Sequence, residues 1–309
     1  MSIVFVIDSE GNPLLPTHPA RSRKLLRENK ARIKSVVPFT IQLNRKIDKP
    51  IGKFIVGIDD GAKYVGIAVK NNKTNIVVFH GQLKHRQDVS KKMEARKNYR
   101  KNRRRKLRYR QPRFSNRIGR TLQPSIRQRK DCIIRVIKDL RKCLNIIEVK
   151  VEEVSFNQNK VRYKRYFSLV QIGKNYLKEN IQKLGLIYKR TFGYFTLKSR
   201  LKLGLSKRHS YDACAVLKSN KLIGTEYYIK PKRTKCWENN PTKTCKEKNG
   251  FRHYDLVKSR HGKRGIVIGS VRSLKASCIT LRTKFDDNFP VSYSKTVLLQ
   301  RFGGLVYSF

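Results

Sequence analysis

Acidic residues are scarce in this chain of 309 residues. Only 21 Asp and Glu stand against 73 Lys and Arg, so the formal net charge at pH 7 is +52. Such an excess of one sign opposes compaction through self-repulsion unless a polyanion neutralises it. The imbalance therefore favours a large nucleic-acid footprint, with an affinity that falls steeply as the salt concentration rises.

Long apolar runs and paired cysteines are also missing. No run approaches the roughly 20 apolar residues of a membrane span, and residues 3–7 are too short and too soon followed by an acid for a signal peptide. None of the six cysteines forms a C-x-x-C pair, and a zinc site from Cys236, Cys245, His253 and His261 would have a spacing that fits no common zinc module. Isolated reduced thiols indicate a reducing compartment. The expected location is the bacterial cytoplasm or an organelle stroma or matrix, without secretion or a membrane partner.

The stretch 54–69, FIVGIDDGAKYVGIAV, organises the rest of the chain. A mostly apolar run leads into Asp59 and Asp60, Gly61 permits a tight turn, and a second β-type run follows, which predicts a hairpin. A buried sheet rarely holds an unpaired carboxylate, because desolvation of the carboxylate costs roughly several kcal/mol. A bound cation would remove that cost, so Asp59 is a candidate metal ligand; a turn aspartate is the alternative, and it suits Asp60 better.

A second acidic site follows a later apolar run. Residues 146–153 read IIEVKVEE, which predicts a strand that ends in two carboxylates. Both Glu152 and Glu153 are candidates for a second metal ligand, since nothing in the local pattern separates them. Glu152 is the preferred one, by alignment with the family described below.

The third acidic site opens a late helix in residues 204–213, GLSKRHSYDA. Ser206 is the expected N-cap, and His209 and Asp212 lie three apart on one helical face. An Asp on a first strand, a Glu at a later strand end and an Asp on a late helix are how RNase H-like nucleases hold two divalent cations. Hard oxygen ligands suit Mg²⁺, with Mn²⁺ as the alternative, and two ions about 4 Å apart can activate water and stabilise a leaving oxygen.

The most biased segment is 91–110, in which twelve of twenty residues are basic and no Pro or Gly interrupts. Helix-forming residues predict one helix over 91–110, followed by a basic linker from Gln111. Phosphates along this helix would offset its self-repulsion; a disordered basic arm or a localisation signal is the alternative. The expected nucleic-acid contacts are Arg21, Arg96, Arg100, Arg103, Arg104, Arg105, Arg108 and Arg110.

The rest of the chain supplies the frame around these sites. We expect strands at 3–7, 35–43, 76–83 and 187–189, a helix from Ala20, and amphipathic helices at 125–144 and 169–184. Gly193 begins a loop that leads to the late helix. Residues 223–309 alternate short β-type runs with Gly-, Pro- and Lys-rich turns, which predicts a small basic all-β module.

Several motifs, in order along nearly the whole chain, resemble the IscB/IsrB family of transposon-encoded RNA-guided nucleases. Residues 13–21 look like the PLMP module, with Leu15 where Met is usual. Residues 57–59 look like RuvC motif I, with Asp60 in place of the common Pro, and 96–110 look like the arginine-rich bridge helix. The other matches are Glu152 at the second RuvC carboxylate, duplicated by Glu153, residues 204–213 at motif III, and 251–257 at the start of the module that reads the target-adjacent motif.

The resemblance implies an α/β protein with an RNase H-like (RuvC) nuclease core, a bridge helix, a small PLMP module and a basic β-rich C-terminal module. The catalytic set would be Asp59, Glu152, His209 and Asp212, with the three carboxylates as metal ligands. Only 57 positions separate Glu152 from His209, which excludes an inserted HNH domain and favours the IsrB branch. That branch implies a monomeric ribonucleoprotein with a structured guide RNA, which nicks the displaced strand of its target DNA.

The corresponding division of the chain gives six parts: 1–52 (PLMP-like), 53–88, 117–160 and 161–222 (RuvC parts I to III), 89–116 (bridge helix and linker) and 223–309 (C-terminal module). Two other functions remain open. A guide-free RuvC-like endonuclease shares the acidic residues but does not need the basic helix. A non-catalytic RNA-binding protein needs the charge but not three carboxylates at these places. A protein of this size cannot read a long target with side chains, so delegation of sequence to base pairing fits its charge.

Overall fold

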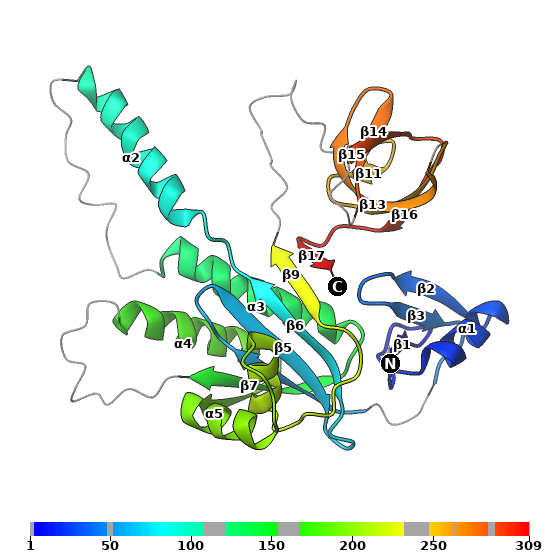
Figure 1. Cartoon of the computed structure of the whole chain (residues 1–309), viewed down its shortest axis with the longest axis horizontal. Helices are drawn as coiled ribbons and strands as arrows, with labels where there is room; N and C mark the ends of the chain where they lie inside the picture. The colour runs from blue at the N-terminus through cyan, green and yellow to red at the C-terminus, as the bar shows by residue number, and fades with distance from the viewer. Residues whose placement is uncertain are drawn as a thin grey trace. The chain divides into compact units, whose positions relative to one another are not determined.

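The computed structural model describes residues 3–47, 52–107, 122–153, 167–231, 247–262, 264–283 and 288–308 (Figure 1). The chain forms two compact units, which are described separately. One unit comprises Lys53–Arg141 and Ile146–Glu226, and the other comprises Met1–Gly52, Lys142–Asn145 and Tyr227–Phe309. None of the helices in the described ranges combines the length and the hydrophobicity that crossing a bilayer requires.

A mixed sheet forms the centre of the first unit. Its strands are β4 (Phe54–Asp59), β5 (Tyr64–Asn71), β6 (Val77–Lys84), β7 (Ile146–Glu153) and β8 (Ile187–Phe192). They lie in the order β6-β5-β4-β7-β8. Strands β4, β5 and β6 pair antiparallel, so the predicted hairpin is confirmed, whereas β4, β7 and β8 pair parallel. An antiparallel meander continued by parallel strands is the sheet of an RNase H-like core.

Helices lie on this sheet and beside it. They are α2 (Val89–Arg105), α3 (Pro124–Arg141), α4 (Phe167–Lys183), α5 (Gly193–Lys202) and α6 (His209–Val216). Helix α6 packs on β4, β5 and β6, where Ala213, Cys214 and Leu217 bury against Ile55 and Ala68. Helices α3 and α4 pack together, and the predicted apolar stripe of α3 is buried from Ile133 to Leu140.

Two predictions about helices are wrong in part. The predicted helix 91–110 begins earlier, at Val89, and ends at Arg105. Lys106 and Leu107 are not helical, and residues 108–110 lie outside the described ranges. No residue of α2 is buried, so no tertiary packing extends the helix against the repulsion among its terminal arginines.

The second error concerns the approach to α6. Residues 193–202, predicted as a loop, form helix α5, and Gly193 is its first residue. Ser206 is not an N-cap either. Arg208 takes the N-cap position in extended conformation, and α6 begins at His209.

The second unit begins with a small α/β layer. It contains β1 (Phe5–Ile7), α1 (Pro19–Arg27), β2 (Ala31–Ser35) and β3 (Thr40–Leu43). The strands lie in the order β1-β3-β2 around a core that includes Val4, Ile41 and Leu43. The single strand predicted over 35–43 is wrong: β2 ends at Ser35, and a turn with Pro38 separates it from β3.

The remainder of that unit, within its described residues, is built from strands. They are β9 (Tyr227–Pro231), β10 (Glu247–Lys248), β11 (Phe251–Arg252), β12 (Leu256–His261), β13 (Gly265–Leu274), β14 (Cys278–Arg282), β15 (Asn288–Ser292), β16 (Thr296–Gln300) and β17 (Leu305–Ser308). Five of them form a sheet in the order β15-β14-β13-β12-β16, with Val257, Val271 and Ile279 in its core. Strand β17 pairs antiparallel with β9.

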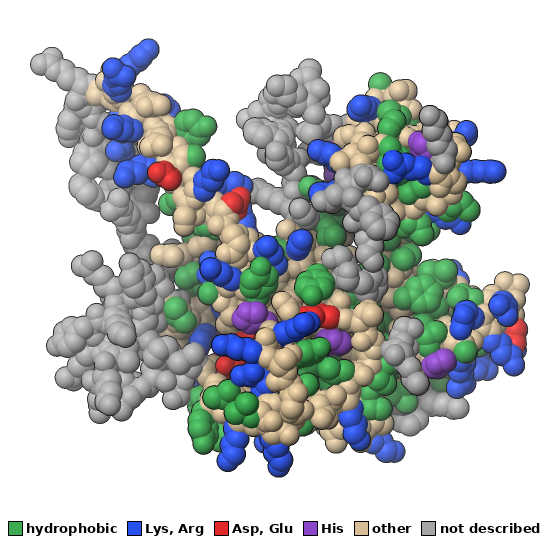
Figure 2. Space-filling view, viewed as in Figure 1, with side chains coloured by type: hydrophobic (Ala, Val, Ile, Leu, Met, Phe, Trp, Pro, Cys, Tyr) green, Lys and Arg blue, Asp and Glu red, His purple; other side chains and the backbone are tan. Residues whose placement is uncertain are grey.

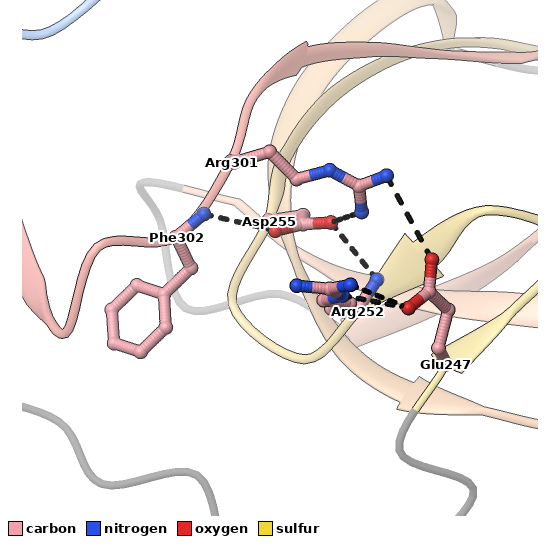
Figure 3. Close-up of polar contacts among 5 residues, drawn as sticks. All are labelled: Glu247, Arg252, Asp255, Arg301 and Phe302. Carbon is pink, nitrogen blue, oxygen red and sulfur yellow. Dashed lines mark hydrogen bonds and ion pairs between the residues drawn. The ribbon is translucent and has the colours of Figure 1, made fainter.

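A buried carboxylate joins two segments of this β-rich part (Figure 3). Asp255 is fully buried and accepts hydrogen bonds from the backbone N–H groups of Arg252 and Phe302, each at 2.9 Å. Its Oδ2 also lies 2.8 Å from Nη1 of Arg301. Arg252 in turn forms an ion pair with Glu247 at 2.8 Å. Three donors therefore compensate the buried charge.

Candidate active site

Asp59 ends β4 at the edge of the antiparallel meander. The parallel register places Ile58 beside Val151. The next residues, Asp59 on β4 and Glu152 on β7, are therefore neighbours across the two strands. Side chains directly opposite on neighbouring strands leave the sheet on the same side. Asp59 and Glu152 therefore share one face, and strand alternation sends Glu153 to the other.

The contacts of Glu152 and Glu153 differ as their faces do. Glu153 is buried, accepts a hydrogen bond from the Tyr188 hydroxyl at 2.5 Å, and lies 4.0 Å from a nitrogen of Arg190. Glu152 Oε2 is buried and has no hydrogen-bond partner among the described residues. An unpartnered buried carboxylate oxygen is costly, and a cation is the usual compensation. Of the two sequence candidates, Glu152 has the vacant oxygen and faces Asp59.

The residue after Asp59 has a different environment. Asp60 forms an ion pair with Lys130 of α3, and both side chains are largely buried. This pair takes Asp60 away from the Asp59 side of the sheet and ties the end of β4 to α3. The turn role that we expected for Asp60 thus includes a contact between two elements of the core.

Burial and crowding set the pKa of Asp59. The side chain is 15% exposed, and burial is the main cause that raises its pKa, to about 6. The nearby carboxylates of Glu152 and Asp212 raise the pKa further, while a hydrogen bond with His209 opposes them. The charged form of Asp59 is therefore destabilised by like charges on both of its neighbours, which is typical of carboxylates that share a cation.

Helix α6 reaches this position because two strand residues lack side chains. A Cβ on Gly66 would lie 1.7 Å from the carbonyl oxygen of His209, and one on Gly57 would lie 2.5 Å from the carbonyl oxygen of Ala213. The first turn of the helix thus rests directly on strand backbone. His209 Nδ1 then lies 2.7 Å from Asp59 Oδ2, and the His209 ring stacks on Tyr64 with centroids 5.8 Å apart.

Asp212 has a partner that the sequence did not reveal. Nε of Arg200, on α5, lies 2.9 Å from Asp212 Oδ1, and the two side chains are 14% and 20% exposed. Burial raises the pKa of Asp212, and the positive charge of Arg200 opposes that rise. The sequence analysis missed Arg200 because it treated α5 as a loop. An aromatic run followed by Leu197 and Leu201 was the available helical signal.

These residues can be tested for their fit to a divalent cation. Within the described ranges, no group of three or more His, Cys, Asp or Glu side chains lies close enough together to hold a metal ion. Asp59, Glu152 and Asp212 nevertheless supply hard oxygen donors, an unpartnered buried oxygen and mutual repulsion. They fit Mg²⁺ or Mn²⁺ in donor type and in charge, provided that Asp212 exchanges Arg200 for the ion.

The predicted nucleic-acid contacts lie mostly on one helix. Every residue of α2 is exposed apart from its half-buried first residue, and Lys and Arg side chains follow the helix in Figure 2. Asp88, just before the helix, pairs with Arg86 and Lys92. Arg21 is exposed on α1. The contacts predicted at 108 and 110, and the zinc candidates at 236 and 245, lie outside the described residues.

Fold and side chains together define a class: an RNase H-like core with acidic residues on one face of its sheet. The model of the RRXRR protein family matches residues 4–172, more than half of the chain, and the chain belongs to this family. A comparison with curated proteins found no match.

Among solved structures, RuvC of Thermus thermophilus with a Holliday junction substrate is 14% identical over 54% of this chain and 90% of that chain, with a TM-score of 0.34. A second Thermus thermophilus RuvC structure is 14% identical over 53% and 91%, with a TM-score of 0.32. A simian T-cell lymphotropic virus intasome complex is 9% identical over 82% and 83%, with a TM-score of 0.17. Values this low assign no function to this chain.

Proposed function

We propose that the chain is a metal-dependent DNA endonuclease of the RuvC type. The observation that carries this proposal is the environment of Asp59. Its carboxylate is only 15% exposed and contacts His209, and burial, Glu152 and Asp212 raise its pKa to about 6. The RRXRR family, which occurs in IscB-type nucleases, supports the same function. The mutual repulsion of three nearby acids costs stability, and bound cations would offset that cost.

In this proposal Asp59, Glu152 and Asp212 hold two Mg²⁺ ions, and Mn²⁺ can replace them. Bound ions of this kind polarise the scissile phosphate and lower the pKa of water. His209 contacts Asp59 through Nδ1, which leaves Nε2 as the ring nitrogen that accepts a proton from the attacking water. Asp59 holds the imidazole in the orientation that this transfer needs, as carboxylates commonly do for histidine.

The way in which the target DNA is held determines which of its two strands is cut. We propose that α2, with its exposed arginines, holds a guide RNA and the RNA–DNA duplex through their phosphates. The paired strand is then occupied, and the displaced strand of the target DNA is free to reach the Asp59 face. One centre without an HNH domain would nick this strand. The active particle is a monomeric ribonucleoprotein of the chain with its guide RNA, as the resemblance to IsrB implies.

The test is cleavage of a supercoiled plasmid that bears the target. The ribonucleoprotein should convert it to open circles in Mg²⁺, and the Asp59→Asn variant should be slower by at least about 100-fold while binding RNA and target nearly normally. Glu153→Gln is the matched control, because Glu153 carries the same charge next to Glu152 but faces Tyr188. End labels on each strand should place the nick opposite the paired strand. Linear product at low enzyme, or unchanged cleavage by Asp59→Asn, would contradict the proposal.

A second candidate function is non-catalytic RNA binding. One observation favours it: Arg200 neutralises Asp212, so the acids do not stand ready for a metal ion. A guide-free nuclease would differ in another respect, since it would purify without a specific RNA. Sequencing of the RNA that copurifies, together with cleavage by the purified particle, separates the three functions.

A further inference from the structure

Helix α5 runs along the acidic residues with one face. Gly193, Thr196 and Arg200 recur at helical spacing on this face. A Cβ on Gly193 would lie 3.0 Å from Glu152 Oε1, and Arg200 holds Asp212. Thr196 is 3% exposed, and its hydroxyl has no hydrogen-bond partner within the described part of the chain. The helix therefore borders two of the three proposed metal ligands.

The exposed part of α5, which begins directly after Gly193, carries apolar side chains where a surface helix normally carries polar ones. Tyr194 and Phe195 are 69% and 53% exposed, and Leu197 and Leu201 are 46% and 68% exposed. The two aromatic rings meet edge to face with centroids 5.6 Å apart. Four exposed large apolar side chains on one helix of ten residues indicate a binding surface.

Positive charge accompanies these rings. Lys198 and Lys202 are exposed on α5 and form no ion pair with a described residue. Figure 2 shows hydrophobic and basic side chains together over the region of this helix. Exposed rings with cations beside them match a chain of planar bases on a phosphate backbone, because bases stack on aromatic side chains while Lys pairs with phosphates. A second protein would gain from the rings but would lose contacts to the lysines.

We propose that α5 is a stacking platform, made of Tyr194 and Phe195, which holds unpaired bases of a single-stranded DNA substrate beside Glu152 and Asp212. This inference rests on the proposed nuclease function and specifies its substrate. Base faces are hidden in a duplex and available in a single strand. The platform therefore selects single-stranded DNA and carries its backbone past the acidic residues.

The experiment measures binding of a labelled oligo(dT) to the full-length chain in EDTA, as a function of salt concentration. Electrostatic contacts set the slope of log K against log salt, whereas stacking sets the affinity that remains at high salt. The Tyr194→Leu/Phe195→Leu double variant, which keeps apolar bulk but removes both rings, should bind about 5- to 100-fold more weakly at every salt concentration, with an unchanged slope. The ring-preserving double variant Tyr194→Phe/Phe195→Tyr should bind like the original chain.

Matched controls separate this effect from a general one. Ile33 is 56% exposed on β2, and Ile33→Ala should leave oligo(dT) binding unchanged. Both α5 double variants should also bind a blunt-ended DNA duplex with the affinity of the original chain. Equal losses for single strand and duplex, a changed slope, or no loss at all would overturn the proposal. So would a change in self-association with single-strand affinity intact, since that result would make the face an interface between copies of the chain.

Failure of the nuclease function would give a different result. Cleavage of a target in Mg²⁺ and oligo(dT) binding in EDTA are independent measurements on the original chain, because the binding assay needs neither metal nor cleavage. If the chain cleaves no target but loses oligo(dT) affinity when both rings are removed, the platform stands and the nuclease proposal fails. If the chain cleaves its target but oligo(dT) affinity is unchanged when both rings are removed, the nuclease proposal stands and the stacking platform is wrong.

Discussion

Two acids of this chain, the buried Asp255 and the half-buried Asp59, have opposite surroundings. Asp255 accepts from two backbone N–H groups and pairs with Arg301, all at 2.8 to 2.9 Å (Figure 3). Within the described part of the chain, the Asp59 side chain has one hydrogen bond, with His209, and two nearby carboxylates disfavour its charge. Both acids are largely withdrawn from water, but donors compensate the charge only in the first case.

The difference separates an acid that stabilises the fold from one that suits the proposed nuclease role. A buried carboxylate with several donors stabilises the fold that holds it, because removing it strands its partners. A buried carboxylate that repels its neighbours costs stability and is retained for what it binds. Glu153 resembles Asp255, because Tyr188 and Arg190 compensate its charge. Glu152 resembles Asp59, because its buried Oε2 has no hydrogen-bond partner among the described residues.

The largest effect should come from removing the compensated acid. Asp255→Ala removes the acceptor of two backbone N–H groups and the partner of the half-exposed Arg301, and it leaves a cavity at a fully buried position, so it should lower the free energy of unfolding by about 3–5 kcal/mol. Asp59→Asn removes a repelled charge and should leave stability equal or higher at pH 7.5. Urea unfolding of both variants checks this contrast. Equal destabilisation by the two substitutions would show that the surroundings of the acids do not distinguish their roles.

A buried histidine extends the comparison to a base. His85 is 2% exposed, its Nδ1 has no hydrogen-bond partner among the described residues, and burial lowers its pKa to about 4. Below pH 6.5 the unfolded chain binds a proton at this residue that the folded chain refuses until about pH 4. Stability should therefore fall as the pH drops through this window, by about 3 kcal/mol in total from this residue.

The variant His85→Gln should flatten this part of the pH dependence. Urea midpoints at pH 7.5, 6 and 4.5 measure it, and the difference between variant and original chain isolates His85 from Asp59, whose raised pKa acts in the opposite direction. An identical pH dependence in both proteins would contradict the prediction.

A smaller effect is expected from the helix that brings His209 to Asp59. In Gly66→Ala, the new Cβ would meet the His209 carbonyl, so α6 must shift, at a cost of about 1–3 kcal/mol. Cleavage should fall more than stability, because the shift moves both His209 and Asp212. Gly303→Ala is the control, since nothing lies within 4 Å of its Cβ position. A fully active Gly66→Ala protein would show that α6 need not rest on the strands.

The smallest effect should follow from removing the cation that compensates Asp212, so that Asp212 resembles the uncompensated Asp59. Arg200→Gln removes the cation that competes for Asp212, so Mn²⁺ should bind roughly tenfold more tightly. Electron paramagnetic resonance titration of Mn²⁺ measures this without cleavage, and Lys198→Gln on the same helix is the charge-matched control. Weaker Mn²⁺ binding by Arg200→Gln would mean that Arg200 supports the ligands instead of competing for them.

The sequence predicted the elements whose patterns are local. The hairpin around Asp59 was visible from its apolar runs, and the buried stripe of α3 from its helical period. Strand alternation also separates Glu152 from Glu153, but only once the register of β7 against β4 is known, and no local pattern gives that register. The domain boundaries and the site residues remain predictions.

The contacts that complete the candidate site depend on tertiary structure. Arg200 and Asp212 meet because α5 and α6 pack together. Helix α5 was missed since its apolar side chains are exposed while Thr196 is buried, which is the reverse of the usual amphipathic pattern. The approach of His209 to Asp59 depends on Gly57 and Gly66, whose importance lies in what a Cβ would touch. Spacing along the chain carries no information about such close approaches.

Helix α2 has no buried residue, and this affects how the protein can be produced and altered. Because no side chain of α2 is part of the core, the helix can be exchanged for another of equal length without repacking the sheet. The number of positive charges on it can therefore be varied independently of the fold. Its exposed lysines and arginines are also sites for trypsin, and bound RNA should shield them. We therefore expect coexpression with RNA to give an intact protein, and expression without it to give two fragments cut between residues 91 and 107.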